Sequence, residues 1–271
     1  VPMREYARAD GRVTLFTSGG QLLLDIDPQE IGFSQSYAID ASMSIGTGLS
    51  GLTIGGRAVS TGSEGPIAGG RLATNFALRD TAGVAAQSEI DALSADLIER
   101  FQDAATDSTL TFGQPGLFTD MGSALSGSPT AGLAGRLKVN SAVVPSEGGD
   151  LWRIRDGLGA STPGLVGDPT QIKNLLGALD RPLAATSGGL QISFSGNLSE
   201  MTTRVSLQRQ SAEDDAAQHA SHLGELTQQM LAQGVDTDAE MQRLLAVEQA
   251  YAANARVIET ADAMLRRLLE I

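Results

Sequence analysis

The sequence predicts an α+β protein with several domains: a glycine-rich antiparallel β domain, and a helical hairpin or bundle that ends in a long C-terminal helix. Three observations predict this class. Nine glycines fall between Gly46 and Gly70, among short apolar runs of strand character. Aromatic residues make up only 4% of the chain, so we expect an aliphatic, alanine-rich core of the kind that packed helices form. From Val235 to Ile271 there is neither glycine nor proline, so nothing interrupts a helix there.

The composition excludes several classes of partner and site. With 271 residues the chain can bury a sizeable core, as one large domain or two ordinary ones. A formal net charge of −13 argues against nucleic acid and anionic membrane surfaces, because both attract a surplus of Lys and Arg. Cysteine is absent, which excludes disulfides, thiolate nucleophiles and thiolate metal sites. No apolar run is long enough to span a bilayer. We therefore expect no nucleic acid or membrane partner, and no motif requires a cofactor.

Residues 1–68 are predicted to form a β-rich domain. Two strand-like runs joined by Ser-Gly-Gly at residues 18–20 indicate a hairpin. Residues 39–45 alternate between apolar and polar side chains, which predicts a strand with one buried face. A further small hairpin is expected to turn at residues 55–56, both of which are glycine.

Residues 69–271 are predicted to form a mainly helical domain. In residues 87–105 apolar side chains recur at helical spacing, and Ser88 is available as the N-cap. A short helix is expected at residues 169–180, and Pro182 closes it off.

A short β-hairpin insert is expected around residues 109–145 of this domain. The surrounding sequence is rich in Gly, Pro and Ser, which is typical of loops. Its strand candidates are residues 108–112 and residues 136–144.

The chain is predicted to end in a helical hairpin, residues 198–271. Its first arm, residues 198–232, is a long polar helix whose apolar stripe is thin and weighted toward alanine. In the short turn that follows, Thr237 and Glu240 fit the Ser/Thr-x-x-Glu capping box. The second arm runs from there to Ile271, about 50 Å at 1.5 Å per residue.

The final helix carries two apolar stripes where a surface helix needs one. The two stripes lie about 100° apart around the helix, so the apolar arc is close to twice the usual width. One stripe can pack on the preceding helix, and the other needs an element outside this chain or a neighbouring subunit. An ordinary internal core helix fits the same pattern. The candidate assembly residues on these stripes are Met241, Leu244, Tyr251, Asn254, Ala255, Val257, Ile258, Ala261, Met264, Leu265 and Leu268.

The motifs that suggest chemistry are weak. Residues 46–51 match the G-x-G-x-x-G dinucleotide fingerprint, but a strand-like run follows where the pyrophosphate needs a helix N-terminus. His219 and His222 lie three residues apart on a predicted helix and could hold a metal, although an exposed acidic helix face explains them better. Trp152 is either a binding anchor or a side chain that holds the edge of a small domain.

Residues 250–262 read Ala-Tyr-x-x-Asn-Ala-x-Val-Ile-x-Thr-Ala-Asp, which resembles the C-terminal signature of bacterial flagellar axial proteins. The turn before it, Gly-Val-Asp-x-Asp-x-Glu-Met at residues 234–241, is similar to that of the hook-associated protein 1 family, which forms the first hook–filament junction. Asp236 and Thr237 depart from that family's usual Asn and bulky residue. The segments "GGRLATNFALRD", "GLFTD" and "LKVNSAVV" resemble the same family.

The resemblance implies a non-enzymatic structural adaptor that joins hook to filament by helical packing of subunits, with its β domain facing outward. Its implied partners are a ring of like subunits, the hook protein, a second hook-associated junction protein and an export chaperone. Its implied location is extracellular, at the hook–filament junction, after type III export without a cleaved signal peptide. The family's N-terminal helical segment, which packs beside the C-terminal helix, is expected to lie outside this sequence.

Two alternatives remain open. The chain could be another flagellar axial protein, of the hook or the distal rod. From a different class, it could be a metal-dependent hydrolase that uses His219 and His222.

Overall fold

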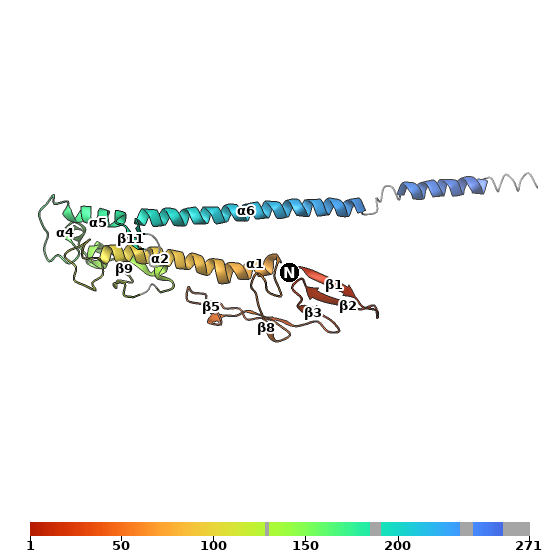
Figure 1. The fold of residues 1–271 in the computed structure, drawn as a ribbon, viewed down its shortest axis with the longest axis horizontal. Coiled ribbons are helices and arrows are strands. Elements are labelled where there is room, and N and C mark those ends of the chain that lie inside the picture. Colours follow the sequence, from red (N-terminus) through yellow and green to blue (C-terminus); the bar gives the residue numbers. More distant parts are fainter. Residues whose placement is uncertain (128–129, 185–190, 234–240, 257–271) are drawn as a thin grey trace, which may run out of the picture. The chain divides into compact units, whose positions relative to one another are not determined.

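The structure is a computed structural model, and it describes residues 1–127, 130–184, 191–233 and 241–256 (Figure 1). Helices and mainly antiparallel strands are both present, and a long helix lies toward the C-terminal end, so the predicted α+β class is confirmed. The chain divides into two compact units, Val1–Thr203 and Arg204–Ile271. The predicted boundary between residues 68 and 69 remains a prediction.

The first unit is organised along one long helical segment. It consists of α1 (Gly70–Ala77), the π-helical turn η1 (Leu78–Ala82) and α2 (Gly83–Gln102). The backbone hydrogen bonds pass through the π-helical turn, where the amide of Gly83 donates to the carbonyl of Leu78. The helix therefore begins earlier than predicted, and Ser88 lies inside it instead of capping it. The prediction was wrong because a π-helical turn lets one helix continue past a local change in pattern.

Short strands form the N-terminal part of the first unit. Three of them pair antiparallel in the order β1-β2-β3, and three more pair antiparallel in the order β4-β7-β8. The remaining pair, β5 with β6, is parallel. The bounds are β1 Met3–Ala7, β2 Val13–Thr17, β3 Leu22–Leu24, β4 Ile31–Phe33, β5 Ser44–Ile45, β6 Gly48–Leu49, β7 Leu52–Ile54 and β8 Arg57–Val59.

Both predicted hairpins are confirmed. The β2–β3 pair encloses residues 18–20, and β7–β8 turns at Gly55 and Gly56. These two glycines have φ of +58° and +75°, as a two-residue type I′ hairpin turn requires, and side chains there would be strained.

The predicted strand over residues 39–45 was largely wrong. Only Ser44–Ile45 forms a strand, and the side chain of Ile39 is exposed. Upstream, the Asp40 carboxylate accepts from the hydroxyl of Ser42 and from its backbone amide, the latter at 2.8 Å, and these hydrogen bonds lower the pKa of Asp40. An Asp side chain that bonds the backbone two residues on favours a turn, so it overrides the alternating pattern.

The two ends of the long helical segment contribute to different cores. Phe76 of α1 packs with Leu52, Ile54 and Ile67 against the β4-β7-β8 sheet. At the other end, α2 contributes a second cluster around Leu133. A third cluster does not involve the segment. The members of the second and third clusters are Ala95, Ile98 and Leu133, and Leu110, Val143 and Leu158.

The segment after α2 contains the predicted short hairpin only in part. Strand β9 (Phe118–Asp120) pairs antiparallel with β10 (Leu137–Val139). The strand predicted at residues 108–112 is absent from this described stretch, because the Asp107 carboxylate accepts from the amide and hydroxyl of Thr109 and forms a turn. The remaining elements are α3 Leu133–Arg136, η2 Ser141–Val143, η3 Pro145–Glu147, α4 Trp152–Asp156, α5 Thr170–Asp180, β11 Leu183–Ala184 and β12 Gln191–Ile192.

Two predicted helices are confirmed. One is α5, Thr170–Asp180. The other is the first arm of the predicted hairpin, which is α6, Phe194–Gln233, a helix of 40 residues. Residues 241–256 are helical as well. The turn with its capping box and residues 257–271 lie outside the described residues, so the hairpin remains a prediction. Within the described ranges, no helix is both long and apolar enough to cross a membrane.

We expect Gly116→Ala to destabilise the first unit. A Cβ at Gly116 would lie 2.1 Å from the backbone carbonyl oxygen of Phe101, so the chain must shift, at a cost of about 1–3 kcal/mol or more. Gly135→Ala in α3 is the matched control, since its Cβ meets no atom within 4 Å. Urea unfolding of both variants measures the difference, and equal free energies of unfolding would contradict the packing described here.

Candidate assembly helix and its anchor

The long helix α6 begins with a side-chain cap. The hydroxyl of Ser193 accepts from the backbone amide of Gly196 at 3.1 Å, which satisfies one of the free donors at a helix N-terminus. The carbonyl of Ser193 accepts from the amide of Asn197 at 3.0 Å. The helix start is therefore fixed locally, within the first unit.

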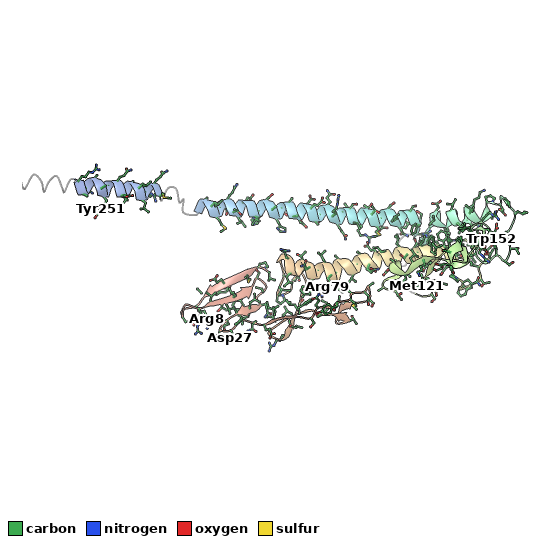
Figure 2. The ribbon with its side chains drawn as sticks, turned by 180° about the vertical axis from the view of Figure 1, so that it is seen from behind. Arg8, Asp27, Arg79, Met121, Trp152 and Tyr251 are labelled. Carbon is green, nitrogen blue, oxygen red and sulfur yellow. The ribbon has the colours of Figure 1, made fainter. Side chains whose placement is uncertain are left out.

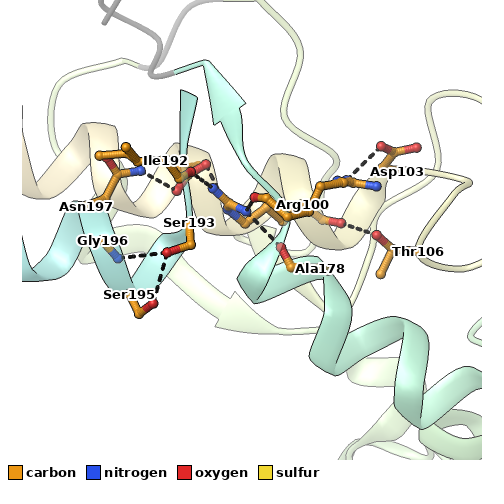
Figure 3. A network of polar contacts seen from close by, with 11 residues as sticks. Arg100, Asp103, Thr106, Ala178, Ile192, Ser193, Ser195, Gly196 and Asn197 are labelled. Atoms are coloured by element: carbon orange, nitrogen blue, oxygen red, sulfur yellow. Dashed lines mark hydrogen bonds and ion pairs between the residues drawn. The ribbon is translucent and has the colours of Figure 1, made fainter. Parts of the chain in front are cut away.

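The fully buried side chain of Arg100 fastens this helix start to α2. Its Nε donates to the Asp96 carboxylate at 2.9 Å, and the two residues lie one turn apart on α2. Its Nη1 donates to the carbonyls of Ala178 and Arg181 at the end of α5, the first at 2.8 Å. Its Nη2 donates to the carbonyl of Ile192 at 3.1 Å (Figure 3). The guanidinium of Arg100 thus connects α2 to the C-terminal end of α5 and to β12, which both lie much later in the sequence.

Asp96 extends this network to α6 itself. Its second carboxylate oxygen accepts from the side-chain amide of Asn197 at 3.0 Å (Figure 3). The carbonyl of Arg100 accepts from the buried Thr106 hydroxyl at 2.7 Å, and Arg181 pairs with Asp103 at 2.8 Å. We call Asp96, Arg100 and Asn197 the anchor. The anchor was not predicted from the sequence, because Asn197 and the backbone carbonyls that bind Arg100 lie far from α2 in the sequence.

Beyond the anchor, α6 has a polar, exposed surface. Every side chain from Thr202 to Ala232 is exposed. His219 and His222 are among them, and the Nδ1 of His222 lies 3.9 Å from Glu225. Within the described residues no group of three or more His, Cys, Asp or Glu side chains is placed to hold a metal.

The helix of residues 241–256 is exposed at its apolar positions too. Met241, Leu244 and Tyr251 are 62%, 71% and 80% exposed, and Figure 2 labels Tyr251 on this helix. Asn254 and Ala255 are exposed on the same helix. Large apolar side chains gain about 1.5–3 kcal/mol each on full burial, so covering this helix would be energetically favourable. The other predicted assembly residues lie outside the described residues: Val257, Ile258, Ala261, Met264, Leu265 and Leu268.

The other residues that the sequence analysis discussed lie elsewhere in the first unit. Trp152 is half-buried at the start of α4, with the guanidinium of Arg153 4.9 Å from its ring centroid (Figure 2). The glycine-rich residues 46–51 include β6 and are followed by strand β7. In this described stretch a strand follows the glycines where a dinucleotide site has the N-terminus of a helix, so the residues do not have the geometry of such a site.

The sequence analysis did not foresee a groove of about 930 Å³ in the first unit. It is bounded by the β4-β7-β8 sheet and by α1 with η1, and most of its wall is apolar. Phe33 and Phe76 line it and pack edge to face, with their ring centroids 6.1 Å apart. The apolar wall of the groove is explained by the packing of the sheet against α1, without a catalytic role for any residue that lines it.

Residues 227–271 match the family described as flagellar basal body rod FlgEFG protein C-terminal. The match indicates a flagellar axial protein of the rod and hook class. No curated protein and no solved structure matches the chain. The family match covers the end of α6 and the helix of residues 241–256, so the exposed apolar positions of that helix lie within the matched segment.

Glu99, which is half-buried and precedes Arg100 in the sequence, makes the stability of the fold depend on pH. Burial raises the pKa of Glu99, with a further contribution from the negative charge of Asp96. The folded state therefore holds this proton more tightly than the unfolded state, and ionisation of Glu99 destabilises the fold.

We expect Glu99→Gln to stabilise the protein at neutral pH but not in acid. Stability is lost as the pH rises from the ordinary carboxyl pKa of about 4.3 through the raised pKa of the folded state, and glutamine removes that loss. Urea unfolding near pH 3.5 and near pH 7, about one unit below and well above the ordinary value, measures the effect. An equal change in stability at both pH values would show that the ionisation of Glu99 is not responsible.

Proposed function

We propose that this chain is a structural component of the bacterial flagellum that joins hook to filament by helical packing of subunits. The observation that carries the proposal is the exposed apolar helix of residues 241–256, which lies within the segment matched to flagellar axial proteins. Its apolar side chains need a cover, and neighbouring subunits of an axial assembly supply helices that pack against it.

The finer assignment to the hook–filament junction rests on sequence resemblance outside the matched segment. The turn at residues 234–241 and the segment at residues 69–80 are both similar to the hook-associated protein 1 family. In the structure the second of these contains the helix α1, Gly70–Ala77. The proposed partners are like subunits in a ring, the hook protein, a second hook-associated junction protein and an export chaperone, and the proposed site is outside the cell.

Another axial role is the second candidate. The family that matches residues 227–271 is described for rod proteins, and this favours a hook or distal-rod protein over a junction protein. Binding to isolated structures separates the two: a junction protein binds the distal end of hooks, whereas a rod protein binds rods.

We expect the double variant Leu244→Ser, Tyr251→Ser to lose binding to hooks isolated from the source bacterium. Both side chains are exposed apolar residues of the proposed interface. Burial of each contributes about 1.5–3 kcal/mol, so the combined loss weakens binding by about a hundredfold or more. Co-sedimentation of the full chain with hooks measures the affinity, and circular dichroism checks that the helix persists.

The matched control is Gln242→Ser, Gln249→Ser, which changes two exposed polar side chains of the same helix. It should bind hooks like the unaltered chain. If the Leu244 and Tyr251 variant binds as tightly as this control, the helix of residues 241–256 is not the binding surface.

We propose further that the chain is not an enzyme. His219 and His222 are exposed on α6, and two imidazoles without a defined third ligand make a poor metal site. Titration with zinc, followed by calorimetry, should therefore give no saturable heat below millimolar metal. Stoichiometric heat that disappears in His219→Ala would instead support the metal-dependent hydrolase.

A further inference from the structure

We propose that the anchor is a positioning device: Asp96, Arg100 and Asn197 together set the direction in which α6 leaves the first unit, and assembly depends on that direction. The second half of this inference rests on the proposed function. The first half concerns the first unit alone, since all three residues and the start of α6 belong to it.

The anchor holds the helix start at two points. Arg100 binds the carbonyl of Ile192, just before α6 begins, and Asp96 binds the side chain of Asn197, inside its first turns. Asp96 and Arg100 lie one turn apart on the same face of α2. A single contact would leave the helix free to pivot, whereas two contacts, one just before the helix and one in its first turn, restrict the direction of its axis.

The choice of residue at position 197 supports a role for its side chain. Asparagine is a poor helix former, because it competes for backbone hydrogen bonds. Here its side-chain amide donates instead to a carboxylate from another helix, at 3.0 Å. That carboxylate is itself fixed by the buried Arg100, so its position is set by the core of the unit.

Because α6 is long, a small change in the direction of its first turn moves its C-terminal end by a large distance. From Asn197 to Gln233 the helix spans roughly 54 Å, so a tilt of about 10° at the base displaces its far end by about 9 Å. Helices pack at interaxial distances of about 8–10 Å with interdigitated side chains, so such a displacement prevents packing of subunits in register. Freedom at the anchor would therefore be incompatible with a regular assembly.

The test uses Asn197→Ala, which removes the contact but favours the helix itself. Ser199→Ala is the matched control, because the Ser199 hydroxyl bonds only within α6, to the carbonyl of Ser195 at 2.8 Å. The chain has no cysteine, so Ala86→Cys on α2 and Thr203→Cys on α6, both exposed and both in the first unit, place spin labels uniquely. Pulsed electron paramagnetic resonance then measures the distribution of distances between the labels in the full chain.

We expect the unaltered chain and Ser199→Ala to share one narrow distribution, and Asn197→Ala to widen it while the helix content stays unchanged. Asn197→Gln retains the amide donor and should narrow the distribution again in part. In co-sedimentation, Asn197→Ala should weaken binding to isolated hooks although Leu244 and Tyr251 are intact.

Each outcome decides a different point. An Asn197→Ala distribution as narrow as that of the control would overturn the positioning role, whatever the binding result. A wider distribution with unchanged hook binding would overturn the link to assembly and leave the proposed function standing. If the unaltered chain binds no hooks, the proposed function fails, while the distance measurement still decides whether the anchor sets the direction of α6.

Discussion

The burial of one charged side chain, Arg100, is the constraint on which the arrangement of the first unit depends. A guanidinium removed from water costs several kcal/mol unless its donors find partners. Only one of those partners is a carboxylate, that of Asp96, and the others are carbonyls of α5 and its C-cap and of β12. The C-terminal end of α5 and strand β12 must therefore lie within hydrogen-bonding distance of the guanidinium. Because α6 begins directly after β12, the position of its first residues is fixed as well.

Two other buried acids of the same region act in the same way. Asp91 of α2 accepts from the amides of Gly132 and Ala134 at 2.7 and 2.8 Å, and so caps the short helix α3 from outside. Asp107, just after α2, accepts from the amide of Leu158 at 2.8 Å. Aliphatic clusters fill the interior of this region, and these polar side chains decide which loop lies where.

The second unit follows the opposite principle. Its described side chains are exposed, with large apolar groups such as Leu223, Met230 and Leu244 facing solvent. A free chain gains nothing from such groups, because their hydrophobic free energy is realised only on burial. The first unit is thus fixed by internal polar contacts, whereas the second exposes apolar side chains, and the proposed assembly would cover them.

The sequence by itself determined the elements whose signal is local: the glycine turns at residues 18–20 and 55–56, helix α5, and the helices α6 and 241–256. Periodicity and turn chemistry act over a few residues, so they can be recognised from the sequence alone. The structure also showed that α2 starts upstream of Ser88 and that residues 39–45 turn, because a π-helical turn and the Asp40–Ser42 hydrogen bond override the apolar pattern locally. Only the tertiary structure decided that Asp96, Arg100 and Asn197 form the anchor, because its partners come from distant parts of the chain and no spacing of side chains encodes where a carbonyl will lie.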